Sequence, residues 1–463
     1  MRSSGDILLI SCYELGHQPY HLASLQTMFR KAGYFPVSID IAVETLTDET
    51  INKARFVGVS VPMHTALRLG QQLAKRVRLL NPSAHICFYG LYASLNADYL
   101  LQDCADSTIG GEYEIPLLNL ISSLESGKAL SIPGVSTREQ SSAPWVQRTP
   151  FVVPERNQLP PPDRYARLQL NGEQSLAGYT ETTRGCKHTC LHCPITPIYR
   201  GRFFAIPAEI VMADIRAQIA QGVRHITFGD PDFFNGPTHA LRITRALHAE
   251  FPNVTFDATI KIEHLLKHRH LLPELRDLGC AFIVSAVESL NDDVLRHLDK
   301  GHTSAQVAEI FDLMEQVGIP LRPSLMPFSP WETLESYIAL LAFFEEHKLI
   351  EHVDPVHFSI RLLIPPGSAL LDTSETLECL GELDAAAYTY RWTHPDPRMD
   401  DLHHAVSTLV EKAQSVKADP IETFFHIKSL ALAANRQDMC VSCAIKGYGT
   451  RKVLPHLTES WFC

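Results

Sequence analysis

One short run of sequence, Arg184-Gly185-Cys186-Lys187-His188-Thr189-Cys190-Leu191-His192-Cys193-Pro194, decides what fold and chemistry to expect of this chain. Its three cysteines directly follow segment 178–183, whose apolar pattern predicts a strand. Thiolates are the usual ligands of iron–sulfur clusters, and three ligands for four irons leave one iron open to chelate a small molecule. The alternative is a zinc site with His188 or His192 as fourth ligand, although zinc sites usually combine two such halves.

The sequence around this run alternates strand and helix patterns over residues 176–370. Six segments predict strands, and amphipathic helical patterns lie between them: 178–183, 225–228, 255–259, 281–286, 321–326 and 357–363. Six strand–helix units predict a barrel, complete or partial, that we describe as a partial (β/α)6 barrel. The chemistry of such a barrel is expected at the C-terminal ends of its strands.

The rest of the chain divides into three parts. Residues 1–128 alternate buried-type strands with helices, which predicts an α/β domain with a doubly wound parallel sheet. Residues 129–175 are rich in proline and serine and predict a linker. Residues 371–463 predict a mainly helical C-terminal region that ends in a cysteine-bearing tail.

Composition narrows the class of protein. The chain has 463 residues, 45% hydrophobic and 20% charged, so it can bury sizeable cores. A net charge of −11 disfavours nucleic-acid binding. No apolar run reaches 18 residues and the N-terminus lacks an export pattern, so we expect no membrane span and a cytoplasmic location. Eleven cysteines in such a chain predict reduced thiols rather than disulfides.

The C-x₃-C-x₂-C spacing after a first barrel strand resembles the signature of the radical S-adenosylmethionine (SAM) superfamily. The resemblance implies that Cys186, Cys190 and Cys193 hold a [4Fe–4S] cluster whose fourth iron binds SAM. It also implies an enzyme, a transferase, that reductively cleaves SAM to give a carbon radical. Its partners would be a small-molecule substrate and an electron donor such as flavodoxin or ferredoxin.

Three other segments resemble the SAM contacts of that superfamily, and each lies at the end of a predicted strand. The implied cofactor-binding residues are Phe228, Gly229, Asp230 and Asp232 after the second strand, Lys261 and Glu263 after the third, and Ser285 and Glu288 after the fourth. No further catalytic residue is assigned.

The N-terminal domain, with Gly110-Gly111-Glu112 after its last strand, resembles the cobalamin-binding domain of many radical SAM enzymes. Cobalamin domains that ligate cobalt through a lower histidine carry Asp-x-His-x-x-Gly, and neither Cys12-Tyr13-Glu14-Leu15-Gly16-His17 nor Val61-Pro62-Met63-His64 fits it. Two interpretations stay open: the domain binds cobalamin without that histidine, or it carries no corrinoid. Cobalamin is possible, and the second interpretation is preferred.

The tail carries Cys440-Val441-Ser442-Cys443 and the terminal Cys463. With the preceding features it resembles a Cys-tailed subgroup that includes the radical SAM enzyme of arsinothricin biosynthesis. The resemblance implies transfer of the 3-amino-3-carboxypropyl group of SAM to trivalent arsenic held by the tail thiolates, as part of natural product biosynthesis. The alternatives are a cobalamin-dependent radical SAM methyltransferase of a small natural product or peptide, and a metal or redox sensor without turnover.

Overall fold

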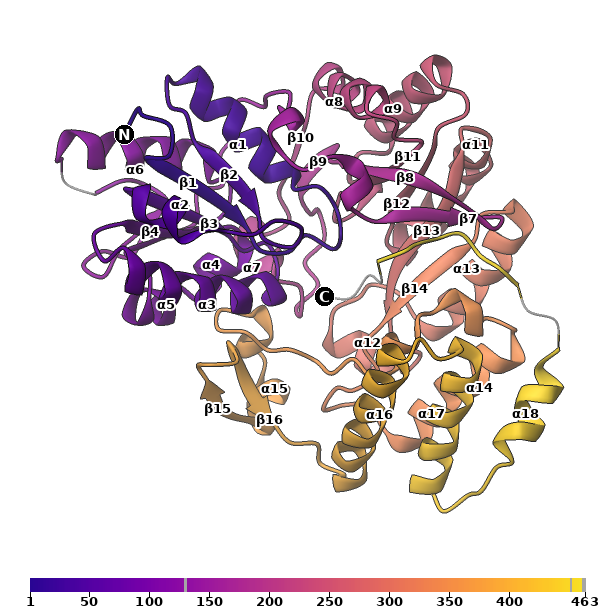
Figure 1. The fold of residues 1–463 in the computed structure, drawn as a ribbon. Coiled ribbons are helices and arrows are strands. Elements are labelled where there is room, and N and C mark those ends of the chain that lie inside the picture. Colours follow the sequence, from indigo (N-terminus) through magenta and orange to yellow (C-terminus); the bar gives the residue numbers. More distant parts are fainter. Residues whose placement is uncertain (129–130, 450–451, 460–463) are drawn as a thin grey trace.

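The structure, a computed structural model, describes residues 1–128, 131–449 and 452–459. Its N-terminal part is a doubly wound α/β unit with sheet order β2-β1-β3-β4-β5-β6 (Figure 1). The first five strands are parallel and β6 is antiparallel at the edge. The strands are β1 (Ile7–Ser11), β2 (Val37–Asp40), β3 (Phe56–Ser60), β4 (His85–Tyr89), β5 (Ser107–Ile109) and β6 (Val135–Ser136).

Helices cover the two faces of this sheet because its strands are apolar on both sides. They are α1 (Tyr20–Lys31), α2 (Asp48–Lys53), α3 (His64–Leu80), α4 (Leu91–Leu95), α5 (Ala97–Asp103) and α6 (Glu114–Ser126). Two separate hydrophobic clusters, one on each face, contain the apolar strand residues in alternation, such as Leu8 and Ile10 on one face and Ile7 and Leu9 on the other.

The second sheet forms a curled half-barrel with strand order β14-β13-β12-β11-β8-β7-β17. Strands β8 to β14 of this order are parallel, whereas β7 is antiparallel to β8 and β17 is antiparallel to β7. The strands are β7 (Arg167–Leu170), β8 (Glu173–Thr180), β11 (His225–Phe228), β12 (Thr255–Thr259), β13 (Cys280–Glu288), β14 (Leu321–Leu325) and β17 (His456–Leu457).

The helices of the half-barrel pack on its outer face. They are α8 (Ala208–Ala220), α9 (Pro237–Glu250), α10 (Ile262–Lys267), α11 (Leu272–Asp277), α12 (Asp292–His297), α13 (Ser304–Val317) and α14 (Leu334–Glu346).

The α/β fold class with a partial barrel is confirmed, but the sixth predicted strand is wrong. Residues 357–363 make only an isolated bridge between Arg361 and Phe328, after a 3-10 helix at Pro355–Phe358. Pro355, Pro365 and Pro366 flank this segment and favour irregular backbone.

The C-terminal region is mainly helical, with one hairpin: α15 (Ser374–Cys379), β15 (Leu380–Asp384), β16 (Thr389–Trp392), α16 (Pro397–Ser415), α17 (Pro420–Ala434) and α18 (Val441–Tyr448). Helices α16 and α17 add to the barrel core through residues such as Val406 and Phe424. Among the described helices, none combines the length and the apolar character that a bilayer span requires.

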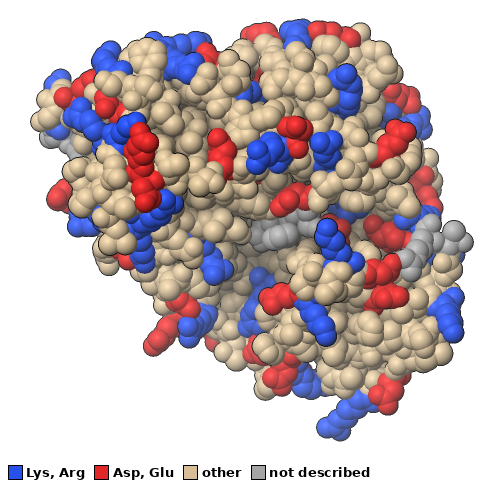
Figure 2. Space-filling view, viewed as in Figure 1, with Lys and Arg blue, Asp and Glu red and all other residues tan. Residues whose placement is uncertain are grey.

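Positive and negative side chains alternate over the face seen in Figure 2, which is hollowed near its centre between the two lobes. No broad single-sign field lies on that face. Clustered Lys and Arg would be needed to displace the counterions of a nucleic acid.

Candidate active site

The three-cysteine run lies in a loop closed by a short antiparallel pair, β9 (Thr183–Gly185) with β10 (Phe203–Ala205). Gly185 adopts φ +78°, and a Cβ there would lie 2.6 Å from the Arg202 carbonyl oxygen. Only glycine combines that conformation with so close an approach. The backbone therefore turns sharply at the residue before Cys186.

Buried polar side chains hold the loop against the barrel. Asn235 accepts a hydrogen bond from the Lys187 N–H at 3.0 Å and donates one to the Gly185 carbonyl at 3.1 Å. The Thr196 hydroxyl donates to the Cys190 carbonyl at 2.8 Å. These contacts fix the loop on both sides of the cysteines. Sequence reasoning missed Asn235, because an asparagine 42 residues after Cys193 carries no local signal of its partner.

Cys186, Cys190 and Cys193 line one cavity of about 280 Å³ at the C-terminal ends of the barrel strands. This volume is close to the lower end of the ~300–1,000 Å³ typical of pockets for drug-sized ligands. Other walls are largely apolar, and Tyr92 of the N-terminal unit also lines the cavity; the apolar residues are Leu325, Met326, Ile360, Leu362, Leu363 and Pro365. The cavity therefore combines a thiol-bearing wall with room for a small molecule.

Two of the thiols are held in the protonated state by their surroundings. Burial raises the pKa of Cys186 to about 12 and that of Cys193 to about 11, and the charge of neighbouring cysteines adds to both shifts. A bound metal would offset this cost, since ligating thiols release their protons to the metal. The donor set thus fits a [4Fe–4S] cluster with one open iron.

Of the eight residues predicted to contact SAM, some line the cavity and the others lie in or beside the surrounding sheet. Asp232, Lys261 and Glu288 line the cavity. Glu263 lies beside it and pairs with Lys261 at 3.3 Å. Four do not line it: Phe228, Gly229, Asp230 and Ser285.

Those four residues serve the framework. Phe228 is buried in the barrel core and stacks on Phe233 at 4.8 Å. The Gly229 Cα is covered by the Tyr179 ring, which leaves no space for a Cβ. Ser285 is wholly buried within β13.

Asp230 is buried and is hydrogen-bonded by the Thr182 N–H and by the hydroxyls of Thr182 and Thr183. Burial raises its pKa to about 7, although those hydrogen bonds oppose the shift. Its oxygens fix the chain just before the cysteine loop.

Glu288 is the most constrained of the cavity residues. It adopts φ +68° at a β-bulge between β13 and β14, a strained conformation of a kind that clusters at functional sites. Its carboxylate lies 3.2 Å from Lys300 Nζ and 3.3 Å from His192 Nε2. Burial would raise the pKa of Glu288, but the Lys300 ammonium and His192 hold it well below its usual value. Lys300 was not predicted, because it lies outside any strand end.

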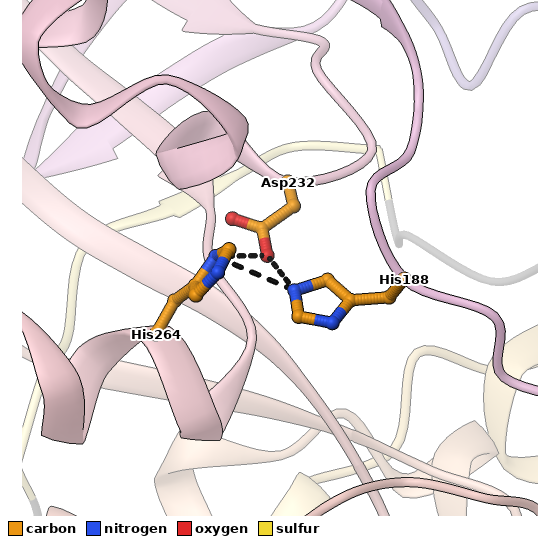
Figure 3. Close-up of side chains that lie close together, drawn as sticks. All are labelled: His188, Asp232 and His264. Carbon is orange, nitrogen blue, oxygen red and sulfur yellow. Dashed lines mark hydrogen bonds and ion pairs between the residues drawn. The ribbon is translucent and has the colours of Figure 1, made fainter. Parts of the chain in front are cut away.

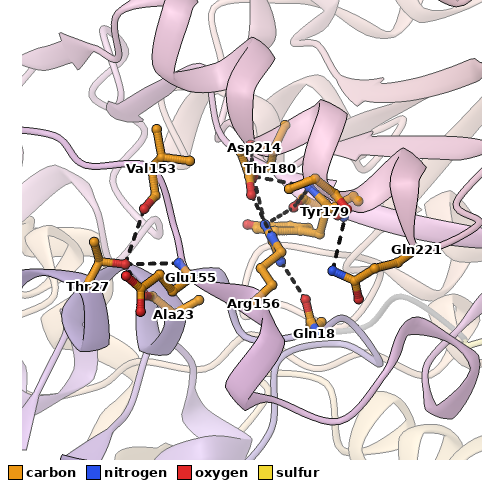
Figure 4. A network of polar contacts seen from close by, with 12 residues as sticks. Gln18, Ala23, Thr27, Val153, Glu155, Arg156, Tyr179, Thr180, Asp214 and Gln221 are labelled. Carbon is orange, nitrogen blue, oxygen red and sulfur yellow. Dashed lines mark hydrogen bonds and ion pairs between the residues drawn. The ribbon is translucent and has the colours of Figure 1, made fainter. Parts of the chain in front are cut away.

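A second crevice, of about 220 Å³, lies between the C-terminal edge of the N-terminal sheet and the barrel. Its walls include Glu112, Glu181 and Arg184, and Arg184 is buried and forms ion pairs with Glu112, Glu114 and Glu181. Nearby, Arg156 donates to Asp214 at 2.6 and 2.9 Å, to Gln18 at 2.9 Å and to the Tyr179 carbonyl at 2.6 Å (Figure 4).

The lining of this crevice is not suited to a corrinoid as it stands. Arg184 and its carboxylate partners form buried ion pairs, which are costly to break, and a corrinoid would have to displace them. The histidines near this edge have other contacts: His64 Nε2 lies 2.7 Å from the Ala387 carbonyl, and His21 Nε2 lies 2.9 Å from Glu181.

The tail cysteines divide between the outside of the barrel and a part of the chain that is not described. Cys440 and Cys443 form a disulfide at the start of α18, with Cα atoms 5.2 Å apart, a spacing suited to a disulfide. The expectation of reduced thiols is therefore wrong for this pair. Helix α18 packs on α17 and, through Tyr448, on Glu351 at 2.7 Å. The cavity wall includes no described residue after Pro365, and Cys463 lies outside the described residues.

The end of the described chain returns to the barrel. Strand β17 pairs antiparallel with β7, so it runs in the same direction as β8, toward the edge that carries the cysteine loop. Beyond it, Glu459 accepts a hydrogen bond from the Tyr13 hydroxyl at 2.7 Å. Tyr13 follows β1 at the C-terminal edge of the N-terminal sheet.

Residues 180–343 match the sequence profile of the radical SAM superfamily. This match covers the cysteine loop and four of the five parallel barrel strands, β11, β12, β13 and β14. The chain therefore contains a radical SAM domain, and this domain makes it a radical SAM enzyme. Proteins of this class use SAM and a [4Fe–4S] cluster, so the predicted superfamily, enzyme class and principal cofactors are confirmed.

Among curated proteins, the chain is similar to the ribosomal protein uS12 methylthiotransferase RimO of Geobacter sulfurreducens, with 28% identity over 199 residues, 38% of this chain and 42% of that protein. It is also similar to the tRNA-2-methylthio-N(6)-dimethylallyladenosine synthase of Desulfosudis oleivorans, with 27% identity over 189 residues, 39% of this chain and 40% of that protein. The chain thus matches about two fifths of each relative's length.

Two solved structures share the fold over most of the chain. One is the cobalamin-dependent SAM radical enzyme OxsB, with TM-score 0.69 and 16% identity over 88% of this chain and 66% of that chain. The other is the radical SAM methyltransferase TsrM from Kitasatospora setae, with TM-score 0.63 and 15% identity over 96% of this chain and 98% of that chain. At these identities the likeness establishes the fold.

Proposed function

We propose that this chain is a radical SAM transferase that uses SAM as radical source and group donor, without a corrinoid. One observation carries the proposal: buried ion pairs border the crevice above the N-terminal sheet, while the barrel cavity is bordered by three cysteines and apolar side chains. A corrinoid-dependent methyl transfer would need space for the corrinoid at the C-terminal edge of the N-terminal sheet, where these ion pairs lie.

In this proposal Cys186, Cys190 and Cys193 hold the [4Fe–4S] cluster, which supplies the electron that breaks a sulfonium C–S bond. Asp232, a buried carboxylate on the cavity wall, is suited to accept hydrogen bonds from the SAM ammonium group. Lys261 Nζ, also on the wall, is suited to pair with the SAM carboxylate.

The specific reaction that we propose is transfer of the 3-amino-3-carboxypropyl group of SAM to trivalent arsenic. Soft thiolates are suited to hold such an acceptor, and β17 runs toward the edge that carries the cysteine loop. With arsenous acid as acceptor the balance requires two electrons and one proton. The sulfonium C–S bond breaks, a C–As bond forms, and one As–OH group leaves as water. A reductant of the flavodoxin or ferredoxin class would supply the electrons.

Of the tail cysteines, Cys463 is the proposed acceptor ligand. Cys440 and Cys443 would have to be reduced first, and they lie on α18 outside the barrel.

Product analysis tests this function. The anaerobically reconstituted protein is incubated with dithionite and SAM, with and without arsenite, and the products are identified by mass spectrometry. We expect methylthioadenosine and an aminocarboxypropyl arsenical. S-adenosylhomocysteine together with 5′-deoxyadenosine, or corrinoid retained after expression with hydroxocobalamin, would contradict the proposal. Cys463→Ser should lower arsenical formation at least tenfold, while the matched Cys379→Ser variant should retain it.

A second candidate is transfer to a macromolecule, because the curated relatives are named for acting on a ribosomal protein and a tRNA. The size of the cavity favours a small acceptor instead. The same assay separates the two candidates, because a macromolecular acceptor would leave the small-molecule products unchanged by arsenite.

A further inference from the structure

Three side chains from separate parts of the barrel converge beside the cysteine loop. They are His188, from the loop itself, Asp232, from the segment after β11, and His264, from α10 (Figure 3). His264 Nδ1 lies 2.8 Å from Asp232 Oδ2, His188 Nε2 lies 3.2 Å from the same oxygen, and the two ring nitrogens are 3.4 Å apart. Figure 3 shows the three groups pointing toward one another.

These separations match the edges of a metal coordination sphere. With bonds of ~2.1 Å to imidazole nitrogen and carboxylate oxygen, neighbouring ligand atoms lie about 3.0 Å apart in an octahedron and about 3.4 Å apart in a tetrahedron. Two histidines and one carboxylate on one face form a ligand set used by Fe²⁺ and also suited to Zn²⁺.

The carboxylate oxygen at the centre of the group contacts two imidazole nitrogens but makes no hydrogen bond of normal geometry. Asp232 is 1% exposed, and its Oδ2 is buried without a hydrogen bond of normal geometry, although two ring nitrogens lie within 3.2 Å. A buried carboxylate oxygen left in this state costs free energy. A cation held between the oxygen and the two nitrogens would remove that cost.

The surroundings also suit metal ligation. A metal-bound histidine usually donates its other ring N–H to an acceptor, which orients the ring. Glu263 Oε2 lies 3.6 Å from His188 Nδ1. Lys261 Nζ also lies 3.3 Å from His188 Nδ1. The Lys261 ammonium is itself paired with Glu263 Oε2, at 3.3 Å. With the proposed ion bound, His188 Nδ1 would donate to Glu263 while Lys261 keeps its pairing with that carboxylate.

We propose that His188, Asp232 and His264 form a mononuclear site for a divalent cation of the Zn²⁺ or Fe²⁺ class, separate from the three cysteines. His188 and Asp232 also line the 280 Å³ cavity, so the remaining coordination positions face the space next to the cluster. The inference goes beyond the proposed function and does not depend on which group is transferred. If Asp232 holds this ion, the SAM ammonium group takes another acceptor.

Zinc binding to the cluster-loaded protein tests this site. One equivalent of Zn²⁺ is added after reconstitution, weakly held metal is removed with a mild chelator, and zinc and iron are counted per chain. We expect one zinc per chain, unchanged iron, and a zinc K-edge X-ray absorption spectrum with nitrogen and oxygen neighbours and imidazole scattering. Sulfur neighbours, or no retained zinc, would overturn the proposal.

Variants locate the bound ion. His264→Gln and Asp232→Asn should each weaken zinc binding at least tenfold while iron content stays the same. His270→Gln, an exposed histidine shortly after α10, is the matched control and should bind zinc like the parent. Retention of full zinc affinity in both site variants contradicts the assignment. The X-ray absorption spectrum of the unaltered protein identifies the ligand type without any variant. The site is therefore tested even if a variant fails to fold. Loss of activity plays no part in the readout, so failure of the transferase proposal is a separate result.

Discussion

Both parallel sheets of this protein present their C-terminal edges to an interdomain space, but different kinds of side chain lie at the two edges. At the N-terminal sheet, Glu112 and Glu114 pair with the buried Arg184 beside the crevice, and we call this the filled edge. At the barrel, three cysteines border an open cavity. Ligands of α/β sheets bind at such edges. The contrast teaches that the edge offers a place for a ligand, and that the side chains decide whether it is used.

The largest effect that the contrast predicts is at the barrel edge, where the three cysteines border the cavity. Cys186→Ala should prevent assembly of a normal cluster and reduce SAM cleavage by at least about 10³-fold, the scale of losing an essential catalytic group. Iron and sulfide content, visible absorbance and nucleoside products measure this. Cys379→Ala, a half-buried thiol away from the cavity, is the control. A variant that still binds four irons and cleaves SAM normally would refute the role of Cys186.

The second effect is at the filled edge, where ion pairs stabilise the domain contact. Arg156 and Asp214 are each 1% exposed, so Arg156→Gln leaves a buried carboxylate unpaired and should cost about 3–5 kcal/mol of unfolding free energy. Arg216 and Glu250 make a similar two-bond pair that is 51% and 38% exposed, and Arg216→Gln should lower the unfolding free energy far less, because water screens an exposed pair. Urea unfolding of the full chain compares them. Equal costs would contradict the role assigned to burial.

Local patterns predicted much of the fold. The strands at 225–228 and 255–259 have the predicted bounds, because each is a short run rich in β-branched and aromatic residues. The cysteine loop was equally visible, since its three thiols are close in sequence. These features depend on neighbours along the chain.

Contacts between distant residues were not predictable in the same way. Strand β17 pairs with β7, whose residue Gln169 lies 287 positions before its partner His456, and no local pattern in His456–Leu457 marks that partner. Lys300 and Asn235 act at the site only because the fold brings them to Glu288 and to the loop. Asp230 was predicted as a SAM contact, but its oxygens are occupied by Thr182 and Thr183. Sequence spacing gives the position of a carboxylate, not its partners.

The smallest predicted effect concerns Glu14, in the loop after β1 at the filled edge. Its Oε1 is buried without a hydrogen-bond partner among the described residues, and burial raises the pKa of Glu14 to about 7. A carboxyl whose pKa is raised on folding stabilises the fold fully below its unfolded value, near 4.5, and this contribution is lost as pH rises through about 7.

The parent protein should therefore lose about 1–2 kcal/mol of unfolding free energy between pH 5 and pH 8.5 that Glu14→Gln does not lose, a range discounted for partial exposure of this side chain. Urea unfolding at several pH values measures the difference. Glu173→Gln, at an exposed position in β8, is the control and should follow the parent. If Glu14→Gln and the parent show the same pH dependence, the Glu14 carboxyl is solvated in solution. The filled edge would then be more open to water, and to a ligand, than its ion pairs indicate.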